Sequence, residues 1–424
     1  MRVLVIGAGL SGLGVARLLK SHNYDVTLCN RSDFEGREAL EAMGVVCILN
    51  DDVSNNDGSF DMAVKAPGIK PDHPLAASFD FCYNEIECAA QFSPQASYYA
   101  LSGTNGKTTT ATLLHQMLLQ KNDNALLAGN VGYALSEAVY RDGDSKRDVA
   151  LEISAFQMAG TKQFHPKVYA LMNLAPDHLD HYGDVERYYH DKFILADRCD
   201  IFIRNSDDPM IMAHPVKEGI QVIDISLNKS ADVYLEAGKI MYHDTALFEV
   251  KNLKLMGRHN LMNASFASLM AHLAHVSSDG IQRVIQSFSG VEHRCEFVKE
   301  LKGVSYYNDS KATNPESTQV CLEGLPPSII LLAGGSQKHI SFDLLKQYTS
   351  KLKHVYVFGE SAQDLMAVFP QATLVETMQE ALVLAHNVAQ DGDSVVLSPA
   401  CASYDQFKNF EERGMIFKDL VHKL

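Results

Sequence analysis

The sequence predicts an α/β protein with mostly parallel sheets, organised in three domains. Short apolar strands alternate with helices along all 424 residues, which is typical of parallel α/β sheets. Glycine-rich or polar segments directly follow many of these strands, as ligand-binding loops do in such sheets. At about 150 residues per domain, the length corresponds to three domains. We place them at 1–94, 95–290 and 291–424: a Rossmann-like N-terminal domain, a central P-loop ATPase domain and a Rossmann-like C-terminal domain.

Composition argues against several classes of protein. The sequence has no apolar run of about 18 residues, so we expect no membrane span. A net charge of −15 disfavours a nucleic-acid-binding protein, which usually carries a basic face. The eight cysteines contain no C-x-x-C pair, which favours reduced thiols in the cytoplasm over a disulfide framework or a zinc site. The chain opens directly on a strand, so we expect no signal peptide, and we expect a monomer.

The first predicted domain opens on a strand and a glycine-rich turn. The segment VLVIGAGLSG at residues 3–12 fits G-x-G-x-x-G, and we expect a strand at Arg2–Ile6 and a helix at about Ser11–Ser21. Glycines in this pattern allow a close backbone approach to a phosphate, and the helix N-terminus attracts anions. The sequence therefore predicts a ligand that contains phosphate.

The end of the second predicted strand, Val26–Cys29, argues against NAD as that ligand. An NAD-binding fold places an Asp or Glu for the ribose about 20 residues after the turn. Cys29-Asn30-Arg31 stands there instead, and Arg31 suits a phosphate. Two further strands of this domain are expected at Val45–Leu49 and Met62–Val64.

A second phosphate loop opens the predicted central domain. The strand Tyr98–Ser102 leads into GTNGKT, residues 103–108, and a helix is expected to continue to about Leu119. Backbone N–H groups of such a loop cradle phosphates, Lys107 reaches the terminal ones, and the Thr108 hydroxyl can bind Mg²⁺. The loop is shorter than the usual G-x-x-x-x-G-K-[ST] pattern, but its position between a strand and a helix predicts ATP binding.

Three downstream residues are candidate metal ligands. Glu152 ends the predicted strand Val149–Ile153, where a carboxylate suits Mg²⁺, although a buried acid that caps a helix fits the same position. The stretch PDHLDHY contains His178, and its alternative is a polar loop with helix caps. Lys192 lies on a helix expected over about Val185–Asp200, and by residue type alone it is a solvated lysine.

The third predicted domain carries a polar stretch, YYNDSKATNP, after the strand Val304–Tyr307. Asp309 suits a ribose, and Lys311 suits a phosphate or a carboxylate. The alternative is a helix start with Asp309 or Ser310 as the N-cap. The other strands expected in the second and third domains are Val168–Met172, Ile201–Ile203, Ser328–Leu332, His354–Phe358 and Ser394–Leu397.

Seven stretches together resemble the Mur ligases, ATP-dependent amide ligases of peptidoglycan precursor synthesis. They are GTNGKTTT, EISAFQ, NLAPDHLDHY, GRHNLMNA, HRCEFV, YNDSKATNP and SPACASYDQFKNFEERG, and they span nearly the whole chain in the family's order. The last stretch is similar to that of members that add D-glutamate, and no D-N-P-R segment of the diamino-acid-adding members is present. The resemblance implies that D-glutamate is joined to UDP-N-acetylmuramoyl-L-alanine through an acyl phosphate.

The resemblance also implies site residues. ATP would be bound by Gly103, Thr104, Asn105, Gly106, Lys107, Thr108, Thr109, Asn260, Asn263, Arg294, Asp309 and Lys311. The UDP-sugar would be bound by Leu10, Ser11, Asn30, Arg31, Gly68 and Asn130, and D-glutamate by Thr313, Lys338, Ser403 and Phe410. Two Mg²⁺ ions would be held by Thr108, Glu152, His178 and Lys192, with Lys192 carbamylated into a carboxylate-like anion. Lys107, His178 and Lys192 would be the catalytic residues.

Some positions depart from the family pattern, and other interpretations stay open. Ala66 and Ala155 replace serines that are usual there, and Gln337 and His339 flank Lys338 in an altered loop. A ligase of the folylpolyglutamate synthase type would share the phosphate loop. An NAD-dependent oxidoreductase fused to an NTPase module would explain both glycine-rich turns. A nucleotide-sensing protein without catalysis would bind ATP and release no phosphate.

Overall fold

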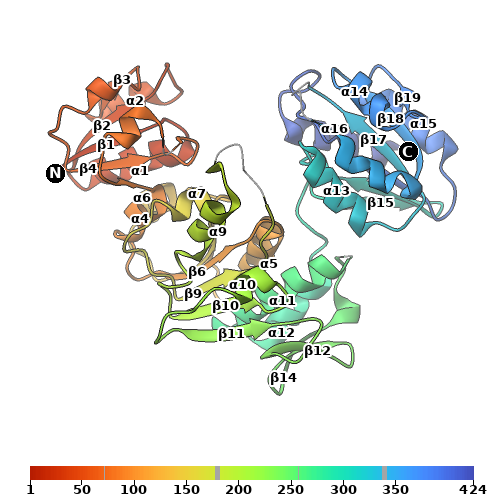
Figure 1. Ribbon diagram of the computed structural model, residues 1–424, viewed down its shortest axis with the longest axis horizontal. Coiled ribbons are helices and arrows are strands. Elements are labelled where there is room, and N and C mark those ends of the chain that lie inside the picture. Colours follow the sequence, from red (N-terminus) through yellow and green to blue (C-terminus); the bar gives the residue numbers. More distant parts are fainter. Residues whose placement is uncertain (71, 177–181, 256, 337–340) are drawn as a thin grey trace. The chain divides into compact units, whose positions relative to one another are not determined.

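The computed structural model describes residues 1–70, 72–176, 182–255, 257–336 and 341–424 (Figure 1). In these residues the strands form three separate sheets of five, nine and six strands. Neighbouring strands are parallel except in the pairs β12–β13, β13–β14 and β15–β16. This is the α/β class with mostly parallel sheets that the alternation of strands and helices predicts.

The five-stranded sheet is built from the N-terminal part of the chain. Its strands, in spatial order, are β3 (Val46–Ile48), β2 (Asp25–Cys29), β1 (Arg2–Ile6), β4 (Met62–Lys65) and β5 (Cys82–Tyr83). The helices are α1 (Leu10–Ser21), α2 (Arg37–Ala42), α3 (Pro74–Ala77) and α4 (Glu85–Ala90). After β1 the chain forms β2 and β3 on one side of β1, and it later forms β4 on the other side. The loops after β1 and β4 therefore flank a switch point, where parallel sheets bind ligands.

The nine-stranded sheet holds the second glycine-rich loop. Its strands, in spatial order, are β14 (Thr245–Glu249), β13 (Lys239–Tyr242), β12 (Val233–Glu236), β11 (Gln221–Ile225), β10 (Ile201–Asn205), β9 (Val168–Leu171), β6 (Ser97–Ser102), β8 (Asp148–Glu152) and β7 (Leu126–Gly129). Its helices are α5 (Lys107–Leu119), α6 (Leu135–Asp142), α7 (Ala155–Met158), α9 (Val185–Phe193), α10 (Pro209–Met212), α11 (Arg258–Leu273) and α12 (Ser278–Ser287). The loops after β6 and β9 flank its switch point.

The six-stranded sheet is built from the C-terminal part of the chain. Its strands, in spatial order, are β15 (Glu296–Leu301), β16 (Val304–Asn308), β20 (Ser394–Leu397), β17 (Ile329–Gly334), β18 (Leu352–Phe358) and β19 (Thr373–Leu374). Its α-helices are α13 (Pro315–Gly324), α14 (Ala362–Val368), α15 (Met378–Val388) and α16 (Phe410–Lys423). Apolar side chains cover both faces of this sheet and form two separate clusters.

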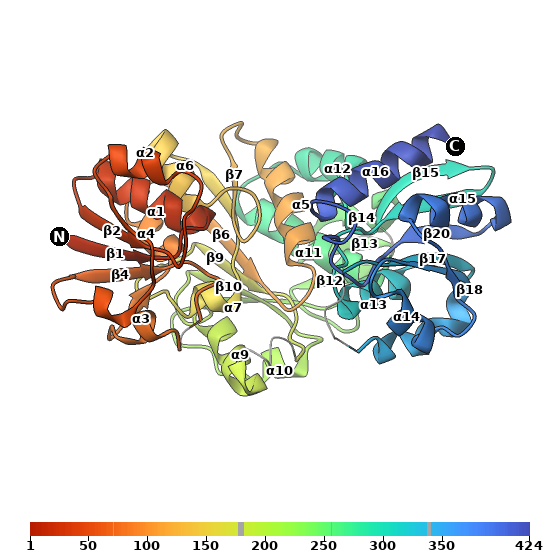
Figure 2. The same ribbon diagram turned by 90° about the horizontal axis from the view of Figure 1, so that it is seen from above.

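Helices α1 and α6 pack against each other, which joins the first two sheets into one body (Figure 2). Arg17 on α1 pairs with Glu137 on α6 at 2.9 Å. A Cβ at Gly14 would lie 2.4 Å from Ser136 Oγ, so glycine is required for the helices to approach this closely.

The observed elements confirm the expected strands, and no strand end is shifted by more than two residues. The helix expected over Val185–Asp200 is shorter than predicted, because α9 ends at Phe193. Beyond it the chain continues in turns that are hydrogen-bonded between residues three apart, such as Ala196 N–H to the Phe193 carbonyl. The antiparallel extension β12–β14 was not predicted.

The chain divides into two compact units. One consists of residues 1–252 and 262–286, and the other of residues 253–261 and 287–424. The start of helix α11 thus belongs to the second unit and its remainder to the first. The domain division at 1–94, 95–290 and 291–424 stays a prediction. Among the described residues, no helix is long and apolar enough to span a membrane.

Candidate active site

A glycine-rich loop connects β6 to α5 at the carboxyl edge of the nine-stranded sheet. Gly106 ends this loop in the left-handed region, with φ +80°. A Cβ at Gly106 would lie 2.3 Å from Asn263 Oδ1, so both the backbone and the available space require glycine. Helix α5 begins directly at Lys107, and the N-terminus of a helix binds anions through its first N–H groups.

Asn173, which follows β9, holds this loop in shape. Its Oδ1 accepts the Asn105 N–H at 2.8 Å, and its Nδ2 donates to the Asn105 carbonyl at 3.0 Å. Its own carbonyl accepts the Thr104 N–H at 3.1 Å. The loop is therefore fixed by protein contacts alone. Asn173 was not among the predicted residues, although a polar residue directly after a buried strand is a usable signal.

Two lysines reach the carbonyl groups of the same loop. Lys107 Nζ donates to the carbonyls of Gly103 and Thr104 at 2.8 and 2.7 Å. Lys192 Nζ donates to the Gly103 carbonyl at 2.9 Å and to Ser102 Oγ at 3.3 Å. Lys192 is only 1% exposed, so the alternative of a solvated lysine is wrong.

Glu152 lies beside the start of the loop, because it pairs with Leu101 across β8 and β6. It is buried, and its Oε1 accepts a hydrogen bond from Asn130 Nδ2 at 2.8 Å. Its Oε2 is buried and has no hydrogen-bond partner among the described residues. An unsatisfied buried carboxylate oxygen is costly, and oxygen is the ligand that Mg²⁺ prefers. Glu152 thus fits a metal ligand, and it caps no helix in the described parts of the chain, contrary to the alternative.

The loop after β1 is the G-x-G-x-x-G turn. A Cβ at Gly12 would lie 1.9 Å from the Gly7 carbonyl oxygen, so glycine is required for this tight turn. Asn30 Oδ1 accepts the Ala8 N–H at 3.0 Å, and Asn30 Nδ2 donates to the Ser32 carbonyl at 2.8 Å. Leu10, in the first turn of α1, is 82% exposed.

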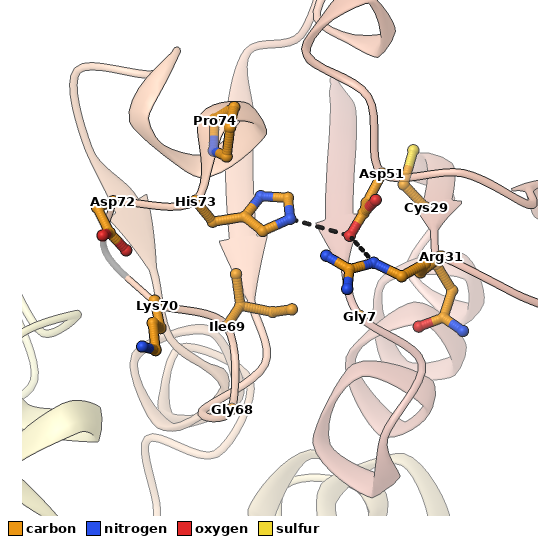
Figure 3. A pocket seen from close by; sticks show the side chains of 11 residues that line it. Gly7, Cys29, Arg31, Asp51, Gly68, Ile69, Lys70, Asp72, His73 and Pro74 are labelled. Atoms are coloured by element: carbon orange, nitrogen blue, oxygen red, sulfur yellow. Dashed lines mark hydrogen bonds and ion pairs between the residues drawn. The ribbon is translucent and has the colours of Figure 1, made fainter. Parts of the chain in front are cut away.

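A cavity of about 560 Å³ opens beside this turn (Figure 3). It is lined by Gly7, Cys29, Asn30, Arg31, Asp51, Gly68, Ile69, Lys70, Asp72, His73 and Pro74. Three residues predicted to bind the UDP-sugar therefore line one cavity: Asn30, Arg31 and Gly68. The other three residues predicted to bind the UDP-sugar do not line this cavity. Leu10 and Ser11 lie on α1, and Asn130 donates a hydrogen bond to Glu152. Asp51 and His73 were not predicted.

The six-stranded sheet places Asp309 directly after β16. Ser398 Oγ donates to its Oδ2 at 2.6 Å, and the Cys295 N–H donates to its Oδ1 at 3.0 Å. Burial raises the pKa of Asp309 to about 6, although the hydrogen bond from Ser398 acts in the opposite direction. Neither Asp309 nor Ser310 caps the next helix: the N-cap of α13 is Asn314, whose side chain accepts the Ser317 N–H.

Lys311 and Phe410 come together although 99 positions separate them in the chain. Lys311 Nζ lies 5.2 Å from the centroid of the Phe410 ring, a cation–π contact. Ser403 is buried, and its carbonyl accepts the Phe407 N–H at 2.8 Å. Thr313 lies in the turn before α13, where its N–H donates to the Lys311 carbonyl.

Arg413 is buried, and although it lies in the stretch SPACASYDQFKNFEERG it was not among the predicted site residues. Its guanidinium donates to Ser310 Oγ at 3.0 Å and to the Ser310 carbonyl at 2.8 Å. It also donates to the carbonyls of Cys401 and Ala402. Burial lowers the pKa of Arg413 to about 10. One side chain thus ties the loop after β16 to the loop after β20, which carries Ser403.

A second candidate metal site consists of Glu292, His293 and Glu296, whose possible ligand atoms all lie within 4.8 Å of one another. Lys418 Nζ already contacts both glutamates, at 2.9 and 2.6 Å. We therefore regard this group as an ion-pair cluster.

The predicted residues fall into two groups by compact unit. The first unit contains Gly103–Thr109, Asn130, Glu152, Lys192, Asn263 and the UDP-sugar candidates near β1. The second contains Asn260, Arg294, Asp309, Lys311, Thr313, Ser403 and Phe410. His178 and Lys338 lie outside the described residues.

Comparison with known families and proteins gives a consistent result. Residues 101–271 match the Mur ligase middle domain, and residues 293–401 match the glutamate ligase domain of Mur ligases. The chain is 36% identical to UDP-N-acetylmuramoylalanine--D-glutamate ligase of Geobacillus sp. (strain WCH70), over 100% of this chain and 98% of that protein. It is 34% identical to the protein of the same name from Listeria monocytogenes, over 100% and 96%.

Solved structures resemble the fold at much lower identity. UDP-N-acetylmuramate-alanine ligase MurC from Thermotoga maritima has a TM-score of 0.62 and 16% identity, covering 100% of this chain and 99% of that one. MurF ligase from the same organism, solved in complex with ADP, has a TM-score of 0.61 and 17% identity, covering 94% and 95%.

Proposed function

The chain belongs to the Mur ligase family, and we propose that it joins D-glutamate to UDP-N-acetylmuramoyl-L-alanine with hydrolysis of ATP to ADP and phosphate. The observation that carries the proposal is the phosphate loop fixed by Asn173, with the buried carboxylate of Glu152 beside it. The two relatives described above match over nearly their full length and are named as D-glutamate ligases, which supports the choice of amino acid.

The proposed chemistry activates a carboxylate, which is a poor acyl donor. An oxygen of the L-alanine carboxylate attacks the γ-phosphorus of ATP, and the bond to ADP breaks. The D-glutamate amine then attacks the carbonyl carbon of the acyl phosphate and loses a proton. The tetrahedral intermediate collapses, and phosphate leaves. In phosphoryl transfer of this kind, positioning and charge neutralisation supply most of the catalysis.

We assign the first phosphate contacts to the start of α5 and to Lys107. In the structure Lys107 Nζ binds the Gly103 and Thr104 carbonyls, so it already lies at the loop that would hold the phosphates. Thr108 and Glu152 would hold one Mg²⁺, and His178 and a carbamylated Lys192 a second. Such ions neutralise charge on the phosphates. The unsatisfied Oε2 of Glu152 supports this assignment.

The remaining roles follow the family resemblance. Adenine would contact Asn260 and Asn263, and the rest of ATP would contact Arg294, Asp309 and Lys311. D-Glutamate would be bound by Thr313, Lys338, Ser403 and Phe410. We further propose a cytoplasmic monomer, and the eight cysteines, none of which forms a disulfide, support a reducing compartment.

The test is phosphate release by the full chain with ATP, Mg²⁺, UDP-N-acetylmuramoyl-L-alanine and a panel of amino acids. D-Glutamate should stimulate release, and L-glutamate should be poor, because inversion at the α-carbon misplaces the amine or a carboxylate. Release with a folate and L-glutamate instead would favour the folylpolyglutamate synthase type. ATP binding without phosphate release on any substrate would favour the sensing protein.

A further inference from the structure

Asp51 lines the 560 Å³ cavity, on the same side as Cys29 and Arg31 (Figure 3). It follows β3, whereas Arg31 follows β2 and His73 belongs to the segment after β4. The figure shows the Asp51 carboxylate between the two other side chains, which approach it from opposite sides. The segments that follow three strands of one sheet, β2, β3 and β4, therefore converge on a single carboxylate.

One carboxylate oxygen of Asp51 contacts both His73 and Arg31. Its Oδ2 accepts the hydrogen bond from His73 Nε2 at 2.9 Å and lies 3.4 Å from Arg31 Nε. His73 Nδ1 is buried and has no hydrogen-bond partner among the described residues, so we place the proton on Nε2. The hydrogen bond from His73 lowers the pKa of Asp51, which keeps the carboxylate ionised at neutral pH. Oδ1 receives no hydrogen bond from another side chain in the described parts of the chain.

Asn30 occupies the position where an NAD-binding fold would carry its ribose acid, and its side chain is already engaged. Its oxygen binds the Ala8 N–H and its nitrogen binds the Ser32 carbonyl. Asn30 therefore shapes the glycine-rich turn. Asp72 also lines the cavity, but it lies on the opposite rim, near Lys70 (Figure 3). Of the two aspartates that line the cavity, Asp51 is the one whose carboxylate lies beside the Arg31 guanidinium.

We propose that Asp51 is the residue that selects uracil in the nucleotide of the UDP-sugar, by accepting a hydrogen bond from uracil N3–H through Oδ1. Arg31, whose side chain is 81% exposed, donates to the adjacent carbonyl oxygen of the base. Cytosine carries a lone pair at N3, which the carboxylate repels, so the same contact rejects cytidine nucleotides. His73 acts as a positioning residue for Asp51. This inference rests on the proposed function, since it requires a uridine nucleotide in the cavity.

The test is calorimetric binding of UDP and CDP to the full chain and to Asp51→Asn. The wild type should bind UDP more tightly than CDP by roughly tenfold to a hundredfold, because a hydrogen bond to a charged group is replaced by a repulsion. The amide that this substitution introduces can donate to cytosine N3, so the variant should bind UDP more weakly and should lose most of the preference. Asp52→Asn is the matched control: it removes the same charge at an exposed neighbour that does not line the cavity, and it should retain the preference.

A second measurement leaves the protein unchanged. The diphosphate of 3-methyluridine lacks the N3–H, and the wild type should bind it more weakly than UDP by the same order. Equal losses of UDP and CDP affinity in Asp51→Asn, or tight binding of the methylated nucleotide, would overturn the role of Asp51. Failure of the wild type to bind UDP at all, with tight binding of NAD⁺, would overturn the proposed function instead.

Discussion

Lys192 Nζ lies 2.9 Å from the Gly103 carbonyl oxygen, although 89 positions separate the two residues in the chain. The lysine comes from α9 and the glycine from the loop after β6. A lysine is seldom fully buried, because removing its charge from water is costly. Its nitrogen nevertheless reaches the loop that we assign to the ATP phosphates, which makes it the first residue to test.

Lys192→Ala should lose most of the ligase activity, and added formate or acetate should restore part of it. A short carboxylate would replace the anionic carbamate that we propose at this position. Lys192→Arg keeps the cation but cannot form a carbamate, so it should be as inactive as the alanine variant. The exposed Lys217 provides a control, and Lys217→Ala should keep its rate. Near-normal turnover by Lys192→Ala would exclude the role.

Asn130→Ala should raise the Mg²⁺ concentration needed for half-maximal activity by roughly 10- to 100-fold, the usual effect of losing a hydrogen bond to a metal ligand. Asn130 orients Glu152, whose other oxygen is proposed to bind the ion. The variant also separates two roles, because a UDP-sugar contact would instead change the KM for the UDP-sugar. Mg²⁺ titrations of the rate at saturating substrates measure this, with the exposed Asn124→Ala as control.

Arg413→Met should lower the free energy of unfolding by about 3 kcal/mol or more, since the buried carbonyls of Ser310, Cys401 and Ala402 would lose a charged donor. Arg413→Lys should be only slightly better, because an ammonium lacks the planar fork that reaches both loops. Denaturant unfolding checks both variants. Lys408→Met changes an exposed cation in the adjoining loop and should leave stability nearly unchanged. An Arg413→Met chain as stable as the wild type would contradict the role.

Asp309 should make stability depend on pH. Its pKa is about 6 in the folded chain against an ordinary value of 3.8. Between these values the folded chain binds more protons, so the free energy of unfolding decreases as pH rises, by about 3 kcal/mol in total. In Asp309→Asn this contribution is absent, so the stability of the variant relative to the wild type should rise by that amount from about pH 4 to pH 7. Urea unfolding at several pH values measures the difference, and a constant difference would contradict the prediction.

Lys338→Ala should raise the KM for D-glutamate roughly 10- to 150-fold, because the γ-carboxylate would lose a charge-assisted hydrogen bond. The KM values for ATP and the UDP-sugar should change little. The expectation rests on the sequence alone, from the position of Lys338 after the Gly334-Gly335 turn. Steady-state kinetics decide it, and an unchanged KM for D-glutamate would remove Lys338 from the site.

Local sequence patterns were enough to predict the two glycine-rich turns. Each needs glycines at fixed spacing after an apolar strand, and the close contacts at Gly12 and Gly106 explain why. The β12–β14 extension was missed because its turns use residues that rarely mark hairpins: Ala237 and His243 adopt positive φ angles of 46° and 48°. The structural role of Arg413 could not be predicted either, since Ser310, which accepts two of its hydrogen bonds, lies 103 positions away in the sequence.

Asp51 and His73 were missed for a related reason. Neither lies in a recognisable motif, and single polar residues after strands are common in any loop. Their significance depends on β3, β2 and the segment after β4 lying in one sheet, an order that the sequence does not state. Asn30 was predicted to contact the ligand, whereas in the structure its side chain supports the turn; its ligand role stays a prediction.

The division of α11 between two compact units has a consequence for exchanging parts between related enzymes. Residues 253–261 belong to the same compact unit as residues 287–424. A hybrid joined at a single point near residue 286 would therefore pair residues 253–261 of one enzyme with the C-terminal part of another. A well-matched chimera needs to transplant both pieces, with one junction inside the helix after Leu261. We expect such a two-piece graft to fold better than the simple C-terminal swap. The same interleaving means that during synthesis the first unit cannot be completed until residue 286 has been added.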